Sequence, residues 1–334
     1  MSQQKQIQLA QRPKGVPTKD VFHFETVDVP VPQNGEVLIQ TKYVSVDPYM
    51  RGRMQDTKSY TPPFKLNEVI QGGVVGEVVE SHSPQFKKGD FVLGFLGWQE
   101  YSTAKAESLT KIDPSIAPLS YYLGILGMPG QTAYFGLLSI GQPKEGETVV
   151  ISGAAGAVGS VVGQIAKIKG AHVVGIAGSD DKLAYLKELG FDETINYKTT
   201  NDLDEAITKA CPNGVDVYFD NVGGDISDAV MNHLNRFARI PVCGAISSYN
   251  ISASEDIGPR VQTKLIKTSA LMQGFIVANY SDRFEEAAKD LAQWVKENKL
   301  TYKETVVEGF DNIPDAFLGL FKGENVGKQL VKIS

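Results

Sequence analysis

Two features of this sequence could do chemistry: a turn of small residues that could bind phosphates, and tyrosines that could act on a substrate oxygen. The turn reads A-x-G-x-x-G over Ala154, Gly156 and Gly159. An apolar, β-branched run (148–152) precedes it, and apolar residues at helical spacing (160–169) follow it. In this order, an approachable backbone and a helix N-terminus can hold a pyrophosphate. The pattern predicts a dinucleotide site. A purely structural turn is the alternative, because Ala154 replaces the usual first glycine.

The end of the next predicted strand favours a phosphorylated ribose. An acidic residue at this position grips the 2′-hydroxyl of NAD, and here the position is Gly178. Lys182 falls in the first turn of the following helix, where it could meet a 2′-phosphate, and Tyr197 follows the third strand, where it could close the same pocket. The alternative interpretation of Lys182 is a solvated helix charge, and Asp180 and Asp181 could repel a phosphate. We predict NADPH as the cofactor.

Two tyrosines are the best candidates for a group that acts on a substrate oxygen. Tyr49 lies in the segment VSVDPYMRGRM, and Tyr249 lies just beyond a predicted strand in CGAISSYN. Ligands of parallel sheets bind at the carboxyl ends of the strands. An unperturbed phenol titrates near 10, so it is a better hydrogen-bond donor than proton source. Each tyrosine could equally be a packing residue with a satisfied hydroxyl.

The cysteines and histidines do not have the spacing of a catalytic zinc site. Such a site needs three protein ligands, usually Cys or His, and related enzymes often add a four-cysteine structural site. Only Cys211 and Cys243 occur, and the four histidines show no ligand spacing. Without that Lewis acid, hydride removal from an alcohol is disfavoured. We expect no metal, and we expect hydride addition to an acceptor that is already activated.

Composition and charge exclude several other classes of protein. A chain of 334 residues with 42% hydrophobic and 22% charged residues is typical of a globular protein of about two domains. The net charge of −6 gives no reason to expect nucleic acid or an anionic membrane as partner. Two cysteines, and an N-terminal stretch without the apolar core of a signal peptide, favour a reducing compartment. We expect a cytoplasmic protein.

The elements that must position these residues fall into two parts. Residues 1–126 carry short, partly alternating strands separated by Gly and Pro turns. Residues 127–301 alternate strands with helices, including a helix expected over 226–237, which predicts a doubly wound parallel sheet. The tail, 302–334, returns to strand character and should pair back onto the first part. The expected fold is α/β, with a nucleotide-binding domain (127–301) and a mostly-β domain (1–126 and 302–334).

The surroundings of the tyrosines carry two further expectations. Residues 250–260, directly after Tyr249, are polar and contain Gly and Pro, so we expect a loop that orders over a bound ligand. Side chains that could line an apolar substrate pocket, or equally belong to the core, are Met50, Met54, Tyr60 and Trp98.

Taken together, several segments resemble the zinc-independent medium-chain dehydrogenase/reductases. They run along essentially the whole chain: VDPYMRGRM, AAGAVGSVVGQIAK, AGSDDK, INYK, FDNVGG, CGAISSYN and GENVGK. More narrowly, the chain resembles the branch of leukotriene B4 12-hydroxydehydrogenase/prostaglandin reductases and plant alkenal double-bond reductases. This resemblance implies a GroES-like β domain, a Rossmann domain, and a homodimer joined through the Rossmann sheets. It also implies NADPH-dependent reduction of the C=C bond of α,β-unsaturated aldehydes and ketones.

The resemblance further implies a set of site residues. Those that would hold the cofactor are Gly156, Ala157, Val158, Gly159, Lys182, Tyr197, Asn221, Cys243, Gly244, Ala245, Ile246, Ser247, Ser248, Tyr249, Phe275, Ile276, Val277 and Asn325. Among them, Lys182 and Tyr197 would bind the 2′-phosphate, and Asn221 would lie near the nicotinamide half. Tyr49 would meet the substrate oxygen, and Tyr249 would touch a ribose hydroxyl or the substrate carbonyl. Both tyrosines are the candidate catalytic residues.

The chemistry that follows is a hydride addition to the β-carbon while a hydroxyl stabilises the developing enolate oxygen. We expect small hydrophobic enals and enones as substrates, since an apolar pocket discriminates weakly between chain lengths. A zinc-independent NADPH quinone reductase is the alternative enzyme, because quinones are also activated acceptors. A non-catalytic NADPH-binding protein is the alternative from another class, and it would retain Lys182 and the glycine turn.

Overall fold

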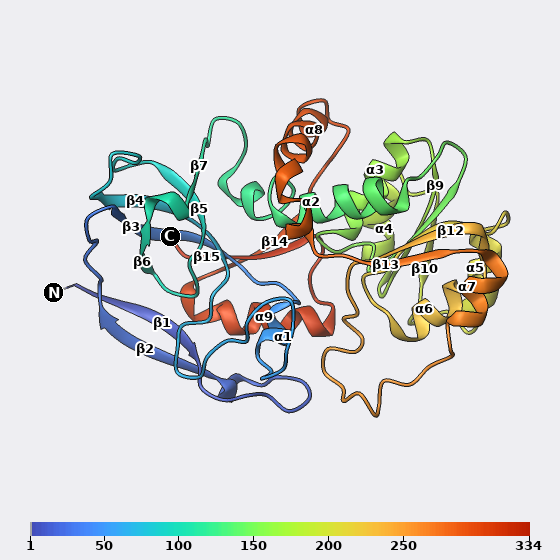
Figure 1. The fold of residues 1–334 in the computed structure, drawn as a ribbon, viewed down its shortest axis with the longest axis horizontal. Helices are drawn as coiled ribbons and strands as arrows, with labels where there is room; N and C mark the ends of the chain where they lie inside the picture. The colour runs from blue at the N-terminus through green and yellow to red at the C-terminus, as the bar shows by residue number, and fades with distance from the viewer. Residues whose placement is uncertain (1) are drawn as a thin grey trace. The chain divides into compact units, whose positions relative to one another are not determined.

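The computed structural model of the chain describes residues 2–334, which form two compact units (Figure 1). The first unit consists of residues up to 124 together with Glu304–Asn325 and Gln329–Ser334. The second unit consists of Ile125–Lys303 and Val326–Lys328. The chain therefore leaves the first unit, completes the second, and returns.

A six-stranded parallel sheet is the centre of the second unit. Its strands in spatial order are β10 (Glu193–Asn196), β9 (His172–Ala177), β8 (Thr148–Ser152), β11 (Val215–Phe219), β12 (Leu234–Val242) and β13 (Leu271–Gly274). All five residues of β8 are buried, because this strand is paired on both edges and covered on both faces. The order reverses beside β8, which is where ligands bind in open α/β sheets. The predicted doubly wound sheet is confirmed.

Helices follow most of these strands. They are α2 (Met128–Phe135), α3 (Gly159–Ile168), α4 (Asp180–Glu188), α5 (Leu203–Ala210), α6 (Gly224–Val230), α7 (Gln262–Thr268) and α8 (Phe284–Lys296). Apolar residues of α5 and α6, such as Ile207 and Val230, pack in one buried cluster with Val150 and Val174 of the sheet. A helix over 226–237 was expected, and this expectation is wrong at its C-terminal end. The helix stops at Val230, because Leu234 is needed opposite Val215 to continue the sheet.

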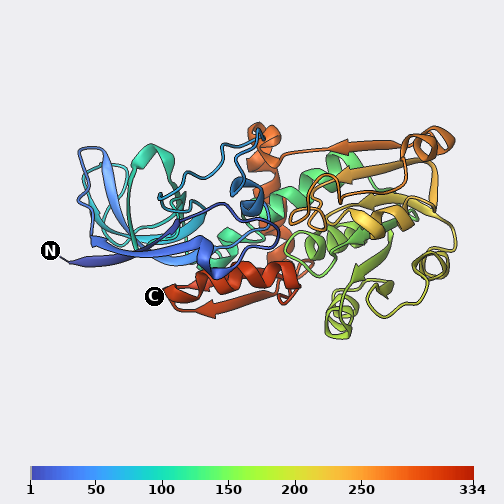
Figure 2. The same cartoon turned by 90° about the horizontal axis from the view of Figure 1, so that it is seen from below.

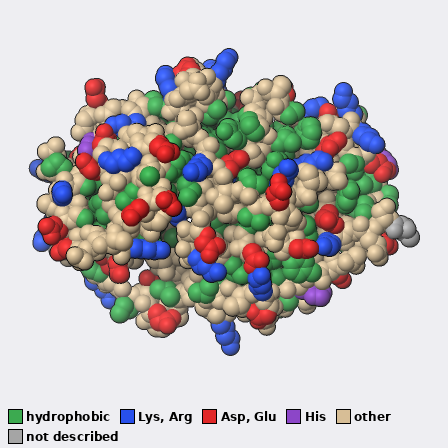
Figure 3. All heavy atoms as spheres, turned by 180° about the vertical axis from the view of Figure 1, so that it is seen from behind, with side chains coloured by type: hydrophobic (Ala, Val, Ile, Leu, Met, Phe, Trp, Pro, Cys, Tyr) green, Lys and Arg blue, Asp and Glu red, His purple; other side chains and the backbone are tan. Residues whose placement is uncertain are grey.

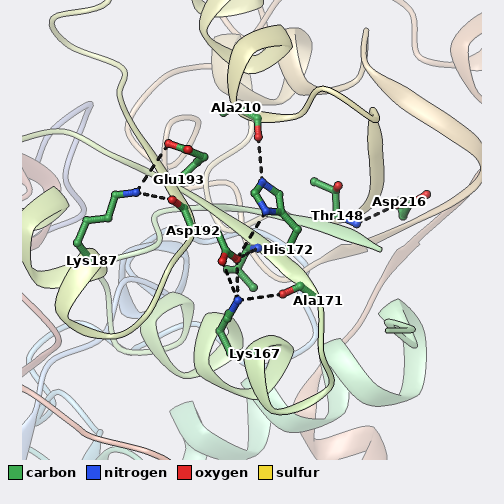
Figure 4. A network of polar contacts seen from close by, with 10 residues as sticks. Thr148, Lys167, Ala171, His172, Lys187, Asp192, Glu193, Ala210 and Asp216 are labelled. Atoms are coloured by element: carbon green, nitrogen blue, oxygen red, sulfur yellow. Dashed lines mark hydrogen bonds and ion pairs between the residues drawn. The ribbon is translucent and has the colours of Figure 1, made fainter. Parts of the chain in front are cut away.

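A polar network ties the amino-terminal side of β9 and β10 (Figure 4). Lys167 Nζ lies 2.8 Å from both carboxylate oxygens of Asp192, and the Val173 N–H donates to the same carboxylate at 2.7 Å. His172 Nε2 lies 3.1 Å from the carbonyl oxygen of Ala210. Since a carbonyl only accepts, that nitrogen carries the proton. The network anchors one end of the sheet and leaves the opposite, carboxyl end for a ligand.

The first unit is built on antiparallel strands. Its main sheet contains β14 (Glu304–Glu308), β15 (Lys328–Lys332), β3 (Glu36–Ser45), β4 (Gly73–Ser81), β5 (Phe91–Phe95) and β7 (Thr110–Ile112), and β6 (Tyr101–Lys105) pairs with β3. A separate hairpin joins β1 (Gln3–Leu9) and β2 (Phe22–Asp28). Strand β15 pairs with β3, with Leu330 opposite Ser45. The C-terminal residues therefore pair with a strand of the first unit, as their strand character predicts.

An aromatic cluster that includes Phe317 of helix α9 (Ile313–Lys322) forms the main core of the first unit. Figure 2 shows α9 as the red helix near the C-terminus. The ring centroids of Trp98 and Phe317 are 5.9 Å apart, and Phe22 packs against both rings. The short helix α1 (Met50–Arg53) begins at Met50 and is followed by Met54, and both methionines are fully buried in the same cluster. These core contacts hold helix α1 in place. They also hold Tyr49, which precedes the helix and packs against the same cluster.

The surface carries mixed charges. Acidic and basic side chains alternate over the face seen in Figure 3. Within residues 2–334, the structure contains no helix long and apolar enough to cross a membrane.

Candidate active site

The glycine turn after β8 has the shape that a pyrophosphate requires. A Cβ on Gly159 would lie 2.5 Å from the Gly153 carbonyl oxygen, so only glycine lets α3 pack this closely on the turn. A Cβ on Gly156 would meet that same oxygen at 3.3 Å and nothing closer, so the outer side of Gly156 is open to an approaching ligand. The amides of Ala157 and Val158, which precede α3, and of Gly159, its first residue, have no acceptor within that helix. This cradle fits the diphosphate of a dinucleotide.

The segment before the last strand lies along this turn. The Gly327 N–H donates to the Ala155 carbonyl oxygen at 2.7 Å, and Gly156 and Gly327 form a parallel bridge. Gly327 has a φ of +68°, and a Cβ there would lie 1.9 Å from the Lys303 carbonyl oxygen. Both the positive φ and this close contact exclude a side chain at position 327. The contact brings the immediate neighbours of Asn325 in sequence to the phosphate cradle.

A pair of lysines, Lys182 and Lys198, lies near the carboxyl end of β9. A Cβ on Gly178 would lie 3.0 Å from the Tyr197 hydroxyl and 3.1 Å from Lys198 Cε, so these two side chains occupy the space where NAD-specific folds place a carboxylate. Burial lowers the pKa of Lys182, and the nearby charge of Lys198 lowers it further. A bound anion would offset the electrostatic repulsion between the Lys182 and Lys198 ammonium groups. The Asp180 carboxylate accepts a hydrogen bond from the Asn196 side-chain amide at 2.8 Å.

Replacing Lys182 by alanine is expected to reduce the preference for NADPH over NADH. One charge-assisted hydrogen bond contributes about 1.5–3 kcal/mol, which corresponds to about 10- to 150-fold in relative affinity. The measurement is the dissociation constant of each cofactor by fluorescence titration. The matched control is Lys187→Ala on the same helix, whose ammonium pairs with Glu193 at 3.7 Å. Equal losses of NADPH and NADH affinity in the Lys182 variant would contradict a role at the 2′-phosphate.

A buried carboxylate that the sequence did not single out organises the carboxyl ends of β8 and β11. Asp220 is 2% exposed, and its Oδ1 accepts from the Ser152 hydroxyl at 2.9 Å, the Val222 N–H at 3.0 Å and the Gly223 N–H at 2.9 Å. The Tyr218 hydroxyl donates to the same oxygen at 2.9 Å. One oxygen atom thus joins the ends of β8 and β11 to the glycine loop that follows β11.

The residue next to Asp220 and the following loop depend on this junction. The Asn221 side-chain amide donates to the Ser152 carbonyl oxygen at 2.8 Å. The Cys243 N–H donates to the Asp220 carbonyl oxygen at 2.8 Å. Burial, and then the Asp220 carboxylate, raise the pKa of the Cys243 thiol to about 12. The thiol therefore stays neutral at physiological pH and is not an activated nucleophile.

The loop that carries Tyr249 is held by short-range contacts. The Ser247 hydroxyl donates to the Val222 carbonyl oxygen at 2.6 Å, and the Ala245 N–H donates to the Tyr249 hydroxyl oxygen at 3.3 Å. A Cβ on Gly244 would lie 3.0 Å from that hydroxyl. The phenol therefore lies across its own loop, where its hydroxyl oxygen accepts a hydrogen bond from the backbone.

The remaining predicted cofactor residues follow β13. The Phe275 side chain is buried against Phe219, with ring centroids 6.3 Å apart, and closes over Gly136. Only the backbone of this residue is thus available to a cofactor. Ile276 and Val277 come next, where the chain enters a short 3-10 helix (Val277–Arg283).

Tyr49 of the first unit is held at the start of α1. The Ser45 hydroxyl donates to the Asp47 carboxylate at 2.5 Å, which fixes the bend between β3 and the helix. Burial, and then the charge of Asp47, raise the pKa of Tyr49 far above its usual value. Tyr49 is therefore a neutral phenol, able to donate a hydrogen bond at any physiological pH.

The side chains proposed to line an apolar pocket divide into two groups. Met50, Met54 and Trp98 are fully buried in the core, so their structural interpretation is correct. Tyr60 is 62% exposed and interacts electrostatically with Tyr49, so it alone of the four remains a candidate for contact with a substrate.

Two family matches cover most of the chain. Residues 5–112 match a family described as the N-terminal domain of oxidoreductase, and residues 157–294 match one described as zinc-binding dehydrogenase. The second name refers to zinc, yet among residues 2–334 no three His, Cys, Asp or Glu side chains are grouped so that they could hold a metal ion.

Relatives match over the full length of the chain. YfmJ of Bacillus subtilis (strain 168), which is named for NADP-dependent oxidoreductase activity, is 70% identical and covers 99% of this chain and 98% of that protein. NADPH-dependent curcumin reductase of Escherichia coli (strain K12) is 47% identical and covers 100% of this chain and 99% of that protein. The crystal structure of CurA from Vibrio vulnificus in complex with NADPH is 47% identical, with a TM-score of 0.94 and 99% of both chains covered.

Proposed function

The chain belongs to the zinc-independent medium-chain dehydrogenase/reductases, in the branch of prostaglandin and alkenal reductases, and we propose that it reduces the C=C bond of small α,β-unsaturated aldehydes and ketones. It is an NADP-dependent oxidoreductase. One observation supports the proposed reaction above the others: Tyr49 is a phenol kept neutral by burial and by Asp47. Such a group can donate to the oxygen of a conjugated carbonyl and stabilise the enolate that forms there.

The residues of the chain divide the work of this reaction. When bound, NADPH supplies the hydride that the β-carbon of the substrate accepts. The glycine cradle binds its diphosphate, while Lys182 and Lys198 bind its 2′-phosphate and select it over NADH. Tyr49 holds the carbonyl oxygen and polarises the conjugated system. Its raised pKa makes it a poor acid, so we assign the protonation of the α-carbon to solvent or to a Tyr249–ribose relay.

The experiment that tests this function is anaerobic NADPH oxidation with a simple enone, a 2-alkenal and a quinone, with the products identified by mass and NMR. A saturated ketone or aldehyde is the expected product, and NADH should be a poorer donor. Quinol formation with inert enones would contradict the proposal and favour a quinone reductase. Tight NADPH binding without turnover of any acceptor would contradict it in favour of a binding protein.

We also propose that the loop 250–260 closes over the bound cofactor. Nearly all of its residues are exposed, including Ile257 at 84%, an apolar side chain that would gain a partner on closure. Trypsin cleavage after Arg260 should slow about tenfold or more when NADPH is saturating, because the closed state is the one stabilised by binding. Cleavage after Lys14, in the first unit, is the internal control. An unchanged rate at Arg260 would overturn the idea.

The sheet edge at β13 is our candidate for a homodimer contact. This strand pairs with β12 alone, and neither β13 nor α7 contains a buried residue among those described. Leu271 and Ile266 are 50% and 78% exposed, and an open edge with apolar neighbours favours pairing with a second copy. Ile266→Lys should shift the mass measured by light scattering from two chains to one, whereas Ile116→Lys in the first unit should not. A monomeric parent protein would contradict this contact.

The cytoplasm is the proposed compartment. Both cysteines are free thiols, which persist where the glutathione pool is reducing.

A further inference from the structure

An arginine stands one helical turn beyond Tyr49. Tyr49 has helical angles, φ −59° and ψ −25°, and caps the helix Met50–Arg53, so Tyr49 and Arg53 are residues i and i+4 of one turn. Side chains four residues apart lie on the same face of a helix. Arg53 is only 8% exposed. The two side chains therefore share a surface, and Arg53 as a whole residue is more deeply buried than most arginines.

The guanidinium of Arg53 is held in place before any ligand arrives. Its Nε donates to the Pro62 carbonyl oxygen at 2.9 Å. Its central carbon lies 4.2 Å from the ring centroid of Phe64 and 5.5 Å from that of Phe95. Aromatic faces favour a guanidinium stacked on them, and a buried planar group between two rings has little freedom to turn.

The two Nη nitrogens of Arg53 have no acceptor in the part of the chain that the structure describes, residues 2–334. The electrostatic partners of the side chain are the hydroxyls of Tyr49 and Tyr60, and no carboxylate is among them. A nine-tenths-buried cation without a counterion is costly unless another group completes it. Burial lowers the pKa of Arg53, but an arginine remains charged in proteins.

A neighbouring arginine illustrates what a purely structural role looks like. Arg12 donates from Nη1 to the Met54 carbonyl oxygen at 3.0 Å and from Nη2 to the Phe64 carbonyl oxygen at 2.9 Å. Both ends of that guanidinium are used by the fold. In the described residues, Arg53 donates a hydrogen bond to the fold from Nε, which leaves its two Nη groups to bind oxygens in a bidentate manner.

We propose that Arg53 is a second catalytic donor, which binds the carbonyl oxygen of the substrate together with Tyr49 and neutralises the charge that this oxygen gains. This inference rests on the proposed function. As a C–H bond forms at the β-carbon, the π electrons of the C=C bond shift toward the oxygen. A neutral phenol and a fixed cation then face the enolate, which takes its proton at the α-carbon from solvent or from the Tyr249–ribose relay. The site would favour acceptors whose negative charge develops on an exposed, unhindered oxygen.

The test compares three variants in the NADPH-loaded enzyme with a simple enone. Arg53→Ala should lower kcat about 10²- to 10³-fold, the loss typical of one oxyanion donor, while the NADPH dissociation constant stays within about twofold. Arg53→Lys keeps the charge without the fork and should retain part of the activity. Lys65→Met is the matched control, because Lys65 is an exposed cation next to Phe64 and pairs with Glu68 at the surface.

Two readouts separate catalysis from mere support of the fold. Millimolar guanidinium should restore part of the kcat of Arg53→Ala, and it should leave the Lys65 variant unchanged. Values of kcat within threefold of the parent enzyme, or a lowered melting temperature with no rescue, would overturn the proposal. If Arg53→Ala does not fold, unreduced kcat in Arg53→Lys would overturn it. Failure of the proposed function is distinguishable, because the parent enzyme itself would then not reduce the enone.

Discussion

Tyr49→Phe is expected to lower kcat/KM for an enone by about 10²- to 10³-fold, since it removes a donor to the oxygen where negative charge develops. The NADPH dissociation constant should not change, because the residues that form the phosphate cradle belong to the second unit. Steady-state and single-turnover kinetics with the same enone measure the effect. Tyr122→Phe is the matched control: its hydroxyl, in the same unit, donates to the Asp113 carbonyl oxygen at 2.8 Å.

The pH profile checks the role of Tyr49 independently. Its pKa is raised, so the phenol remains protonated well above pH 10 and its contribution to catalysis should not fade toward alkaline pH. A donor with an ordinary pKa would be lost near pH 10. A loss of activity centred near pH 10 that disappears in Tyr49→Phe would contradict the raised pKa. Unaltered kcat in Tyr49→Phe would exclude this tyrosine as the principal donor.

Asp220→Ala is expected to lower the free energy of unfolding by about 3–5 kcal/mol, because four donors would lose their common acceptor in the interior. Proteins of ordinary stability have about 5–15 kcal/mol in total, so the loss is large. The same change should weaken NADPH binding, since the loop with Cys243 and Tyr249 is attached to the Asp220 backbone. Urea denaturation and cofactor titration measure the two effects.

Two further substitutions sharpen this test. Asp220→Asn keeps an oxygen at the junction and should cost less than the alanine variant. Asp225→Ala, an exposed carboxylate five residues later, should change stability by no more than about 0.5 kcal/mol. An Asp220→Ala protein that unfolds at the same urea concentration as the parent would show that the junction is not a major source of stability.

The cofactor preference illustrates which contacts can be predicted from the order of strands along the sequence. Gly178, Lys182 and Tyr197 follow consecutive strands, and parallel strands deliver their carboxyl ends to one edge. Their meeting is therefore a direct consequence of the alternating pattern. Lys198 was overlooked, although it directly follows Tyr197. Only the packing of its Cε against Gly178 distinguishes it from a solvated surface lysine.

By itself the sequence determined the fold class, the glycine turn between a strand and a helix, and the cofactor. Each of these rests on residues close together along the chain. Ala154, Gly156 and Gly159 sit between a strand and a helix whose periodicities are local properties. The same holds for the neutral chemistry of the two tyrosines as candidate donors. Local hydrogen bonds and residue spacing suffice for such features, so they are predictable without a tertiary structure.

The tertiary structure decided which polar groups are buried and what they meet. Asp220 joins Ser152, 68 residues earlier, and Phe95 lies against Arg53 across a sheet strand and two loops. Met54 was a candidate pocket residue and lies in the core. The residues from Leu234 to Phe237, which were expected to end a helix, belong to strand β12. Burial and pairing between distant segments depend on the whole packed chain, because the free energy of a polar group changes sign with its surroundings.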